Sequence, residues 1–337
     1  MPILLGDLYC ICVGVLPTVG GMDARLATTA AASNPPQLAP LASPLARGYA
    51  LGLLGVVLFA LTIPMTRLAG GTALAPELPP SFVALGRAAV AGLCSAAYLL
   101  AVRAAWPARA DWPWLALTCL GVVFGFPLLL GLAVREVDAM HAAVVTGLLP
   151  MATAALAAAF LRQRASWGFW LSAWAGLGLV LGYAAWRGAG GLNAADGLLF
   201  AAVLLGAAGY VGGGQLARRM PAQQVICWVL VLALPLTVPS AALSWPQQPA
   251  SVAAWAGFAY VSLVSMWLGF FAWYRALALG GTLRISQVQV LQPFLSMLFA
   301  VPLLGEPLEA GSLAFAAAVV AVVWWGRRQA VQGGPTR

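Results

Sequence analysis

The sequence contains very little charge and no lysine. Only 8% of its 337 residues are charged and 62% are hydrophobic, whereas a soluble globular domain carries about 25% charged residues. Such a composition cannot supply both a core and a water-facing surface, so it excludes a soluble globular protein. The 17 basic residues, all arginine, are not gathered in one polar domain. The net charge of +8 therefore does not indicate a partner made of nucleic acid.

Residues suited to covalent chemistry are also scarce. There is a single histidine, the nine acidic residues are scattered, and none of them falls near the middle of a hydrophobic segment. No Walker-type phosphate loop occurs, so ATP is not expected to drive the protein. We expect no catalytic residues, no metal and no cofactor. Buried thiols, not disulfides, are expected for the five cysteines, which lack metal-site spacing: Cys10, Cys12, Cys94, Cys119 and Cys227.

What the chain does contain is a series of ten hydrophobic segments separated by short turns. A helix that crosses a bilayer needs about 20 apolar residues, and these segments are too long for the strands of a membrane barrel. We predict an all-α integral membrane protein. Its ten transmembrane helices are expected at residues 48–68, 81–102, 112–133, 139–161, 167–186, 196–216, 222–243, 251–274, 283–304 and 307–326.

The first 46 residues differ from the rest of the chain. Residues 3–19 are apolar but short, and residues 28–46 are rich in alanine, serine and proline. This composition predicts a disordered N-terminal leader over residues 1–46. Met22 is an alternative start to Met1. Residues 329–337 are expected to form a short C-terminal tail.

The arginines are distributed unequally between the two sides of the predicted membrane. Three fall in the odd-numbered connections, namely Arg67, Arg135 and Arg187. Because arginine is retained on the cytoplasmic side, we predict cytoplasmic termini and a bacterial-type inner membrane. The leader, the even-numbered connections and the tail carry thirteen: Arg25, Arg47, Arg103, Arg109, Arg162, Arg164, Arg218, Arg219, Arg275, Arg284, Arg327, Arg328 and Arg337.

The second half of the chain repeats the first. When Pro150 is aligned with Pro293, the two surrounding stretches match without a gap. The predicted repeats cover residues 47–188 and 189–328. Because each repeat has an odd number of helices, the second enters the membrane from the opposite side. An inverted repeat permits alternating access around a central site, and one chain holds both halves, so we expect a functional monomer.

The stretch from Ala276 to Glu306 resembles the second repeat of the drug/metabolite transporter (DMT) superfamily, in its EamA-type branch. The resemblance rests on Gln292-Pro293 and on the later run Leu303-Leu304-Gly305-Glu306-Pro307, and it extends over residues 48–326. Arg87 lies where that family often has a basic residue. The first repeat departs from the pattern, because Arg162-Gln163 stands where the motif places Gly-Glu. The aromatic content is similar to that of YddG-type exporters of aromatic amino acids and methyl viologen.

Polar residues inside a membrane are candidates for function because each is costly in lipid. Arg87 lies within the second predicted helix, where it would hold an anionic group of a substrate; alternatively it snorkels outward or pairs with Glu77 or Glu136. His141 would bind substrate or relay a proton; alternatively it is an interfacial cap beside Asp138.

Two helical faces are further candidates for the substrate site. Gln289, Gln292 and Ser296 share one face of the ninth helix, which predicts a wet cavity or, alternatively, hydrogen bonds between helices. The eighth helix carries an aromatic stripe, which would stack flat substrates or, alternatively, face lipid as an interfacial belt. The stripe consists of Tyr260, Trp267, Phe271 and Tyr274.

Proline and glycine mark the candidate hinges for gating. Prolines near the middle of a span are tolerated where neighbours satisfy the freed carbonyls, and Gly213 lies in a glycine-rich run that favours close packing or local unwinding. Plain packing is the alternative for all of them. The four prolines concerned are Pro64, Pro127, Pro150 and Pro293.

Taken together, these patterns predict a secondary transporter that works by alternating access. We expect it to export small amphipathic metabolites, above all aromatic amino acids and aromatic drug-like compounds, with the lipid bilayer as its surroundings. A lipid translocator or channel is the main alternative, although a channel favours rings of like groups. An integral membrane transferase is a further alternative, but it would need a cluster of His, Asp, Glu or Cys at one membrane face.

Overall fold

The computed structural model describes residues 44–160, 166–187, 193–280 and 286–331. Over these residues the chain is helical and contains no strand, only an isolated bridge between Gly71 and Pro76. Eight of the described helical segments are long and apolar enough to cross a membrane, and two shorter apolar helices lie at Val288–Leu304 and Ala310–Gly326. The prediction of an all-α membrane protein is confirmed. Residues 1–43 of the predicted leader, Arg162-Gln163 and Arg284 lie outside the described residues.

We number the ten hydrophobic helical segments as crossings 1 to 10. A short 3-10 turn, η1 (Arg109–Asp111), precedes crossing 3. Crossings 1 to 5 are α2–α3 (Pro44–Ala60, Thr62–Gly70), α4 (Pro80–Ala101), α5–η2–α6 (Trp112–Thr118, Cys119–Gly125, Phe126–Glu136), α7–α8 (Ala139–Thr146, Leu149–Phe160) and α9 (Trp167–Arg187). Crossings 6 to 10 are α10 (Ala194–Leu216), α11 (Ala222–Leu243), α12–η3–α13 (Val252–Ala259, Tyr260–Leu268, Gly269–Gly280), η4–α15 (Ser286–Leu291, Gln292–Leu304) and α16 (Ala310–Val331).

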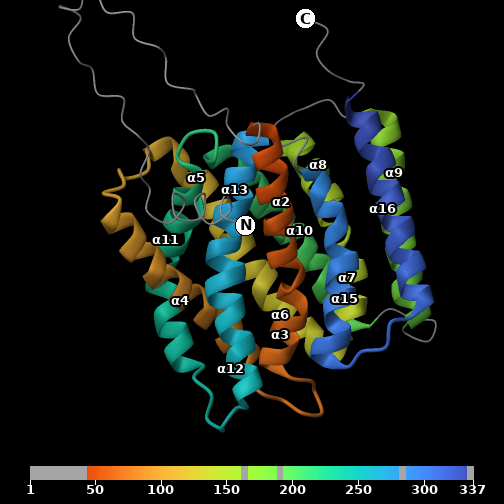
Figure 1. The fold of residues 1–337 in the computed structure, drawn as a ribbon, viewed down its shortest axis with the longest axis horizontal. Helices are drawn as coiled ribbons and strands as arrows, with labels where there is room; N and C mark the ends of the chain where they lie inside the picture. Colours follow the sequence, from red (N-terminus) through yellow and green to blue (C-terminus); the bar gives the residue numbers. More distant parts are fainter. Residues whose placement is uncertain (1–43, 161–165, 188–192, 281–285, 332–337) are drawn as a thin grey trace, which may run out of the picture.

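The crossings form one bundle in which each half contacts the other. Crossing 1 packs against crossing 8, 2 against 7, 3 against 6, 4 against 9, and 5 against 10. In Figure 1, α9 and α16 stand together at one side of the bundle, and α4 and α11 stand at the other. Exchanging each crossing of the first half with its equivalent in the second half (1 with 6, 2 with 7, and so on) gives the same five pairs again. Such a pattern is what two related halves would produce.

Five crossings are interrupted, and in four of them a proline lies just after an interruption. Pro127, Pro150 and Pro293 are each the second residue of a new helix, α6, α8 and α15, and Pro64 is the third residue of α3. Proline is tolerated in the first turn of a helix because its missing N–H would have no intrahelical partner there. All four predicted hinge prolines therefore lie at breaks between helical segments.

The interruptions recur at the spacing of the internal repeat. Helix α8 begins at Leu149 and α15 at Gln292, and α6 begins at Phe126 and α13 at Gly269. Both separations equal the one that aligns the two halves of the sequence. The segments before α6 and α13 are both π-helical. Single-turn π segments inside α-helices are rare and are often found at functional sites, and equivalent interruptions thus surround the centre of the bundle from both halves.

The glycine-rich crossing 6 approaches crossing 3 very closely. A Cβ on Gly209 would lie 3.0 Å from the backbone nitrogen of Val122, and one on Gly206 would lie 2.9 Å from the ring of Phe126. Gly213 lies against the Tyr274 hydroxyl, and α10 continues unbroken through it. At Gly213 the structure has close packing and not the local unwinding that a hinge requires.

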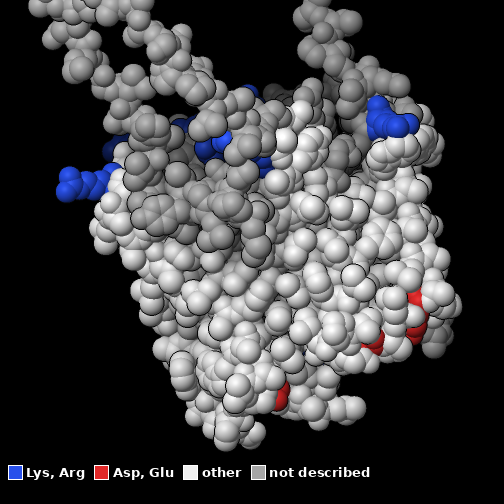
Figure 2. All heavy atoms as spheres, viewed as in Figure 1, with Lys and Arg blue, Asp and Glu red and all other residues white. Residues whose placement is uncertain are grey.

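The two ends of the bundle differ in charge. Figure 2 shows arginine along the upper edge and acidic residues along the lower edge. We call the upper end, which carries Arg103, Arg218 and Arg219, the arginine-rich end. The lower end is the acidic end, and its acids are Glu77, Glu136, Asp138, Asp196, Glu306 and Glu309.

Candidate functional site

A cavity lies at the centre of the bundle, with an empty volume of about 560 Å³ that includes space open to solvent. Seven crossings contribute to its walls, four from the first half of the chain and three from the second. The interrupted crossings 1, 3, 4, 8 and 9 all take part. The lining residues are Phe59, Thr62, Ile63, Arg87, Val122, Phe126, Thr146, Leu149, Gly206, Tyr210, Ser265, Met266, Phe270 and Gln292.

Arg87 on α4 is the one charged residue in this lining, and it is only 3% exposed. Its Nη2 atom donates to the sulfur of Met266 at 3.5 Å, and its Nε atom has no partner. A thioether is a weak acceptor, whereas a guanidinium has five donors. Glu77, an alternative partner, instead accepts from the backbone N–H of Ser251 at 2.8 Å. Arg87 therefore presents a positive charge to the cavity without an acidic partner among the described residues.

Four aromatic side chains share the cavity lining with Arg87. Phe59, Phe126, Tyr210 and Phe270 contribute rings from crossings 1, 3, 6 and 8. Tyr210 lies close enough to Arg87 to interact with it electrostatically. Flat aromatic surfaces around one cation suit a ligand with an apolar ring and an acidic group.

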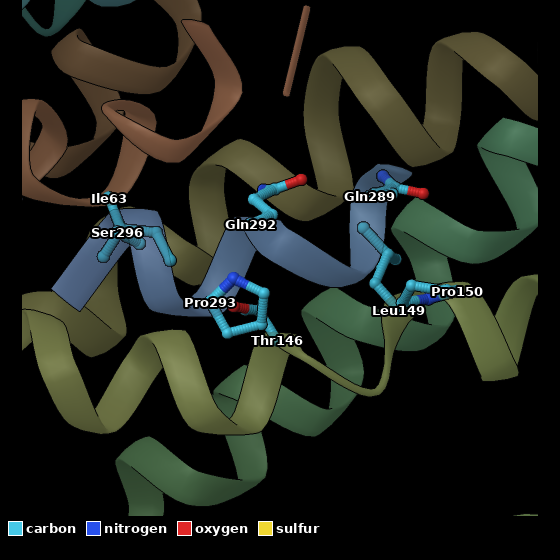
Figure 3. A pocket seen from close by; sticks show the side chains of 8 residues that line it. All are labelled: Ile63, Thr146, Leu149, Pro150, Gln289, Gln292, Pro293 and Ser296. Atoms are coloured by element: carbon cyan, nitrogen blue, oxygen red, sulfur yellow. The ribbon is translucent and has the colours of Figure 1, made fainter. Parts of the chain in front are cut away.

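A second pocket with polar lining residues adjoins the cavity on the side of crossing 9, and its empty volume of about 260 Å³ also includes space open to solvent. Figure 3 shows Gln289, Gln292 and Ser296 arranged along η4 and α15, with Thr146 and Pro150 opposite them. Gln289 is 5% exposed and Ser296 is 1% exposed. The two spaces share four residues, so they form one connected region: Ile63, Thr146, Leu149 and Gln292.

Three polar atoms around this pocket have no hydrogen-bond partner. They are Nε2 of Gln289, Oε1 of Gln292 and Oγ of Ser296. Thr146 differs, because its hydroxyl donates to the carbonyl of Ala142 at 2.8 Å. The large majority of buried polar side-chain atoms in proteins have a hydrogen-bond partner, so a cluster of three unsatisfied atoms around one pocket suits a polar ligand.

The aromatic stripe predicted on crossing 8 is not on the cavity wall. The stripe assumed an α-helix, but residues 260–268 form a π-helix, whose i→i+5 hydrogen bonds change the angle between successive side chains. As a result, Ser265, Met266 and Phe270 reach the cavity.

The stripe residues take part in packing instead. Trp267 contacts the ring of Phe271 with centroids 5.2 Å apart, and Phe271 is buried in the core. Tyr260 donates to the carbonyl of Leu58 at 3.0 Å. Tyr274 is 2% exposed and packs beside Phe270. The stripe is therefore a packing surface between helices in this state.

His141 also lies away from the cavity. Its Nε2 atom is 2.6 Å from Oδ1 of Asp196, and both side chains are almost fully buried. The other oxygen of Asp196 accepts the N–H of Asn193 in a capping box at the start of α10. The ring of Tyr183 covers the histidine at 5.2 Å. The partner is Asp196 and not Asp138, because α10 begins beside α7 at the acidic end.

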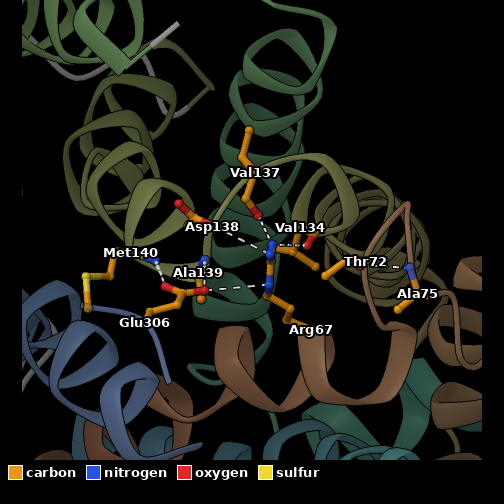
Figure 4. Close-up of polar contacts among 9 residues, drawn as sticks. All are labelled: Arg67, Thr72, Ala75, Val134, Val137, Asp138, Ala139, Met140 and Glu306. Carbon is orange, nitrogen blue, oxygen red and sulfur yellow. Dashed lines mark hydrogen bonds and ion pairs between the residues drawn. The ribbon is translucent and has the colours of Figure 1, made fainter. Parts of the chain in front are cut away.

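A polar cluster at the acidic end joins both halves of the chain (Figure 4). We call Arg67, Asp138 and Glu306 the acidic-end network. Arg67 lies 3.5 Å from Asp138 and 3.6 Å from Glu306, and it donates to the carbonyls of Val134 and Val137. It thereby satisfies free carbonyls where α6 ends, which is also where a positive charge is favoured.

Glu306 satisfies free backbone N–H groups at the start of α7, as Arg67 satisfies free carbonyls at the end of α6. Its two carboxylate oxygens accept the N–H groups of Ala139 at 2.8 Å and Met140 at 3.0 Å. Burial raises the pKa of this carboxyl, although the two N–H groups and Arg67 lower it. The acidic-end network thus ties crossings 1, 3 and 4 to the connection between crossings 9 and 10.

Sequence reasoning named Arg87, Gln289, Gln292 and Ser296, which the structure places around the connected cavity. It missed Phe59, Phe126, Tyr210, Met266 and Phe270, because these side chains lie in uniformly apolar helices where no periodicity marks the inner face. It also missed the pairing of Arg67 with Glu306, since the two residues lie in different halves of the chain and no local pattern connects them. The glycine spacing of crossing 6 was a usable signal, because close approach to crossing 3 brings Tyr210 to the centre.

A bundle of membrane-crossing helices with a central, partly polar cavity lined from both halves is the architecture of a membrane transporter. Comparison with known proteins agrees. The EamA-like transporter family matches the chain twice, over residues 46–184 and 193–325. The chain belongs to this family and is a multi-pass membrane transporter, which implies a small-molecule substrate.

Two individual proteins illustrate the relationship. The chain is 39% identical over 283 residues to the "Uncharacterized transporter YdeK" of Bacillus subtilis (strain 168), and the match covers 83% of this chain and 97% of that protein. A solved crystal structure superposes with a TM-score of 0.59 at 19% identity, covering 86% of this chain and 99% of the other. The second likeness concerns the fold alone.

Proposed function

We propose that this transporter exports small amphipathic aromatic metabolites that carry an acidic group, a class that includes aromatic amino acids and aromatic drug-like acids. The observation that carries the proposal is Arg87, a buried cation in the central cavity with no acidic partner among the described residues. An uncompensated buried charge is costly. A substrate carboxylate would remove that cost while bound and would be held by charge-assisted hydrogen bonds.

The shape and chemistry of the walls support the aromatic part of the proposal. Phe59, Phe126 and Phe270 approach the cavity from three crossings and give it three ring surfaces. A ring slotted among them would gain aromatic contacts beyond the burial of its area, typically about 0.5–1.5 kcal/mol for each pair. A small aliphatic substrate would gain much less from the same walls.

Alternating access supplies the mechanism. The acidic-end network joins crossings 1, 3 and 4 to the connection between crossings 9 and 10, and we propose that it closes this end of the bundle in this state. The proposed repeats, residues 47–188 and 189–328, would exchange roles so that the opposite end closes when the network breaks. The breaks at Pro64, Pro127, Pro150 and Pro293 supply points where helical segments can tilt without loss of regular hydrogen bonds.

The setting follows from the charge distribution. The arginine-rich end is proposed to face the cytoplasm of a bacterial-type inner membrane, which makes both termini cytoplasmic. One chain supplies every described wall of the cavity, so a monomer is proposed as the working unit. His141 is proposed to stabilise the fold near the acidic end and not to contact substrate.

The test is transport by the purified protein in proteoliposomes, with labelled 3-phenylpropionate, phenylalanine and alanine, with and without an imposed pH gradient. We expect saturable movement of an aromatic acid and little movement of alanine, and we expect Arg87→Gln to lower transport of the aromatic acid by about 10- to 100-fold. Arg218→Gln, at an exposed arginine of the arginine-rich end, is the matched control. Unchanged transport by Arg87→Gln would contradict the proposed role of Arg87. Movement of alanine as fast as that of the two aromatic acids, or no movement of either aromatic acid, would contradict the substrate class.

A further inference from the structure

The connected cavity has an unbalanced charge. Two spaces that share Ile63, Thr146, Leu149 and Gln292 contain, among the described residues that line them, one formal charge, which is that of Arg87. A substrate that occupies both spaces therefore meets one cation and no anion. Burial of a charge without a partner is strongly unfavourable. The substrate that fits best neutralises Arg87 and carries no further charge of its own.

The polar atoms of the second pocket indicate which hydrogen-bonding groups the uncharged end of that substrate would carry. Gln289 presents an unpaired amide N–H group, Gln292 an unpaired amide oxygen and Ser296 an unpaired hydroxyl oxygen. These atoms can exchange hydrogen bonds with an amide or a hydroxyl group, which both donates and accepts. An ammonium group would find acceptors there but no opposite charge, and the rings of the cavity would offset only part of its lost hydration.

We propose that the two spaces form one bipartite site for an aromatic monoanion that carries an uncharged hydrogen-bonding group. Its carboxylate binds Arg87, its ring lies among Phe59, Phe126 and Phe270, and its amide or hydroxyl binds Gln289, Gln292 and Ser296. The proposal rests on the proposed function and narrows it. Acylated or deaminated aromatic acids are the preferred substrates, and the free, zwitterionic aromatic amino acids are poorer ones.

Four labelled compounds with the same ring test the charge requirement in proteoliposomes of the full chain. They are N-acetylphenylalanine, 3-phenylpropionate, phenylalanine and phenethylamine. We expect kcat/KM to be at least about tenfold higher for N-acetylphenylalanine than for phenylalanine, with no transport of phenethylamine. Transport of phenylalanine at an equal or higher kcat/KM would overturn this inference and leave the proposed function standing. Transport of none of the four would overturn both.

The polar subsite has its own test. Gln289→Leu and Ser296→Ala should raise the KM for N-acetylphenylalanine about fivefold, the effect of one neutral hydrogen bond, and leave the KM for 3-phenylpropionate unchanged. The second substrate has the same ring and carboxylate but no hydrogen-bonding group. Gln248→Leu, at an exposed glutamine in the connection between crossings 7 and 8, is the control for the substitution itself. An equal change for both substrates would overturn the proposed subsite.

Discussion

Arg67 and Arg87 place the same side chain in two opposite situations within one bundle. Arg67 has two carboxylates and two helix-terminal carbonyls around it, so nearly all of its donors are used. Arg87 has a thioether and an aromatic neighbour, so most of its donors are unused. The first arrangement stabilises the fold. The second leaves a buried charge without an acidic partner among the described residues and is expected to lower stability, as is common where function and stability compete.

This contrast predicts opposite effects on stability. Arg87→Met should raise the midpoint of thermal unfolding in detergent, because it removes a buried charge that lacks a partner, while transport of an aromatic acid falls by about 10- to 100-fold. Arg67→Met should lower the midpoint, because the free energy of unfolding falls by about 1–3 kcal/mol. Differential scanning fluorimetry of the purified variants measures both shifts. A fall in stability for Arg87→Met would show that its charge is already satisfied.

Single residues also show what a sequence can reveal about a site. Arg87, Gln289, Gln292 and Ser296 were found because a polar side chain inside an apolar helix is conspicuous. His141 was equally conspicuous, yet the structure pairs it with Asp196, a distant acid that no local pattern connects to it. The sequence showed that each group is polar and within the membrane, but the choice between cavity and partner depends on tertiary packing.

At the scale of the element, the two π-helical segments help to decide which side chains line the central cavity. The segment Tyr260–Leu268 turns Met266 and Phe270 toward the cavity and leaves Trp267 and Phe271 between helices. A regular α-helix over the same residues would have presented a different face. The equivalent segment, Cys119–Gly125, precedes the cavity residue Phe126 in the first half.

A second prediction follows from which side chains of crossing 8 face the cavity and which lie between helices. Phe270→Ala should lower kcat/KM for an aromatic acid several-fold more than for an aliphatic acid of similar length, because only the aromatic substrate loses a ring contact. Trp267→Ala leaves a cavity between helices and should lower the amount of folded protein. Transport of the two substrates should therefore fall equally. Flux measured per folded molecule separates the two effects. A selective loss in Trp267→Ala would show that the aromatic stripe faces the substrate during the cycle.

The positions of the helices were predictable, but their interruptions were only partly so. Apolar length located the crossings and prolines marked the break points, because both depend on local chemistry. The π-helical register was not predictable, since no residue type specifies it. The acidic-end network was also not predictable from the sequence, because it joins the end of crossing 1 to a connection in the other half of the chain.

The acidic-end network should respond to pH through Glu306. Burial in the closed state raises the pKa of this carboxyl above its ordinary value of 4.5, and opening returns the group to water. The state with the higher pKa binds the proton more tightly. Closure is therefore most stable in acid and loses stability as pH rises through the raised pKa, while Arg67 and Asp138 remain the facing charged groups.

Distances across the acidic end measure this third prediction. Spin labels at Leu74→Cys and Leu308→Cys, two exposed loop positions, report the separation of the two connections in a background without native cysteines. We expect a longer-distance population that grows as pH rises from about 4.5, and its pH dependence should disappear in Glu306→Gln. Growth of that population on acidification would reverse the assigned sign, and pH dependence retained in Glu306→Gln would place the titration on another group.

At the scale of the whole molecule, the two halves are related in three independent ways. The family matches each half separately, the helix breaks recur at the spacing of the internal repeat, and the contacts between crossings are unchanged by exchange of the halves. The charges do not share this relationship. Arg87 has no counterpart acid or base in the described part of the second half of the cavity lining, so each transport cycle is expected to move charge in one direction.

That asymmetry fixes how the membrane potential would act. An electric potential acts on one elementary charge with about 2.3 kcal/mol per 100 mV, which corresponds to about a 50-fold concentration ratio. If one monoanion crosses per cycle without a coupled ion, an inside-negative potential of about 100 mV should hold N-acetylphenylalanine about 50-fold more concentrated outside.

A potassium gradient with valinomycin sets the potential in proteoliposomes, and the final ratio does not depend on the orientation of the inserted protein. If the final ratio of outside to inside concentration does not change with the potential but changes with an imposed pH gradient, one proton travels with each anion.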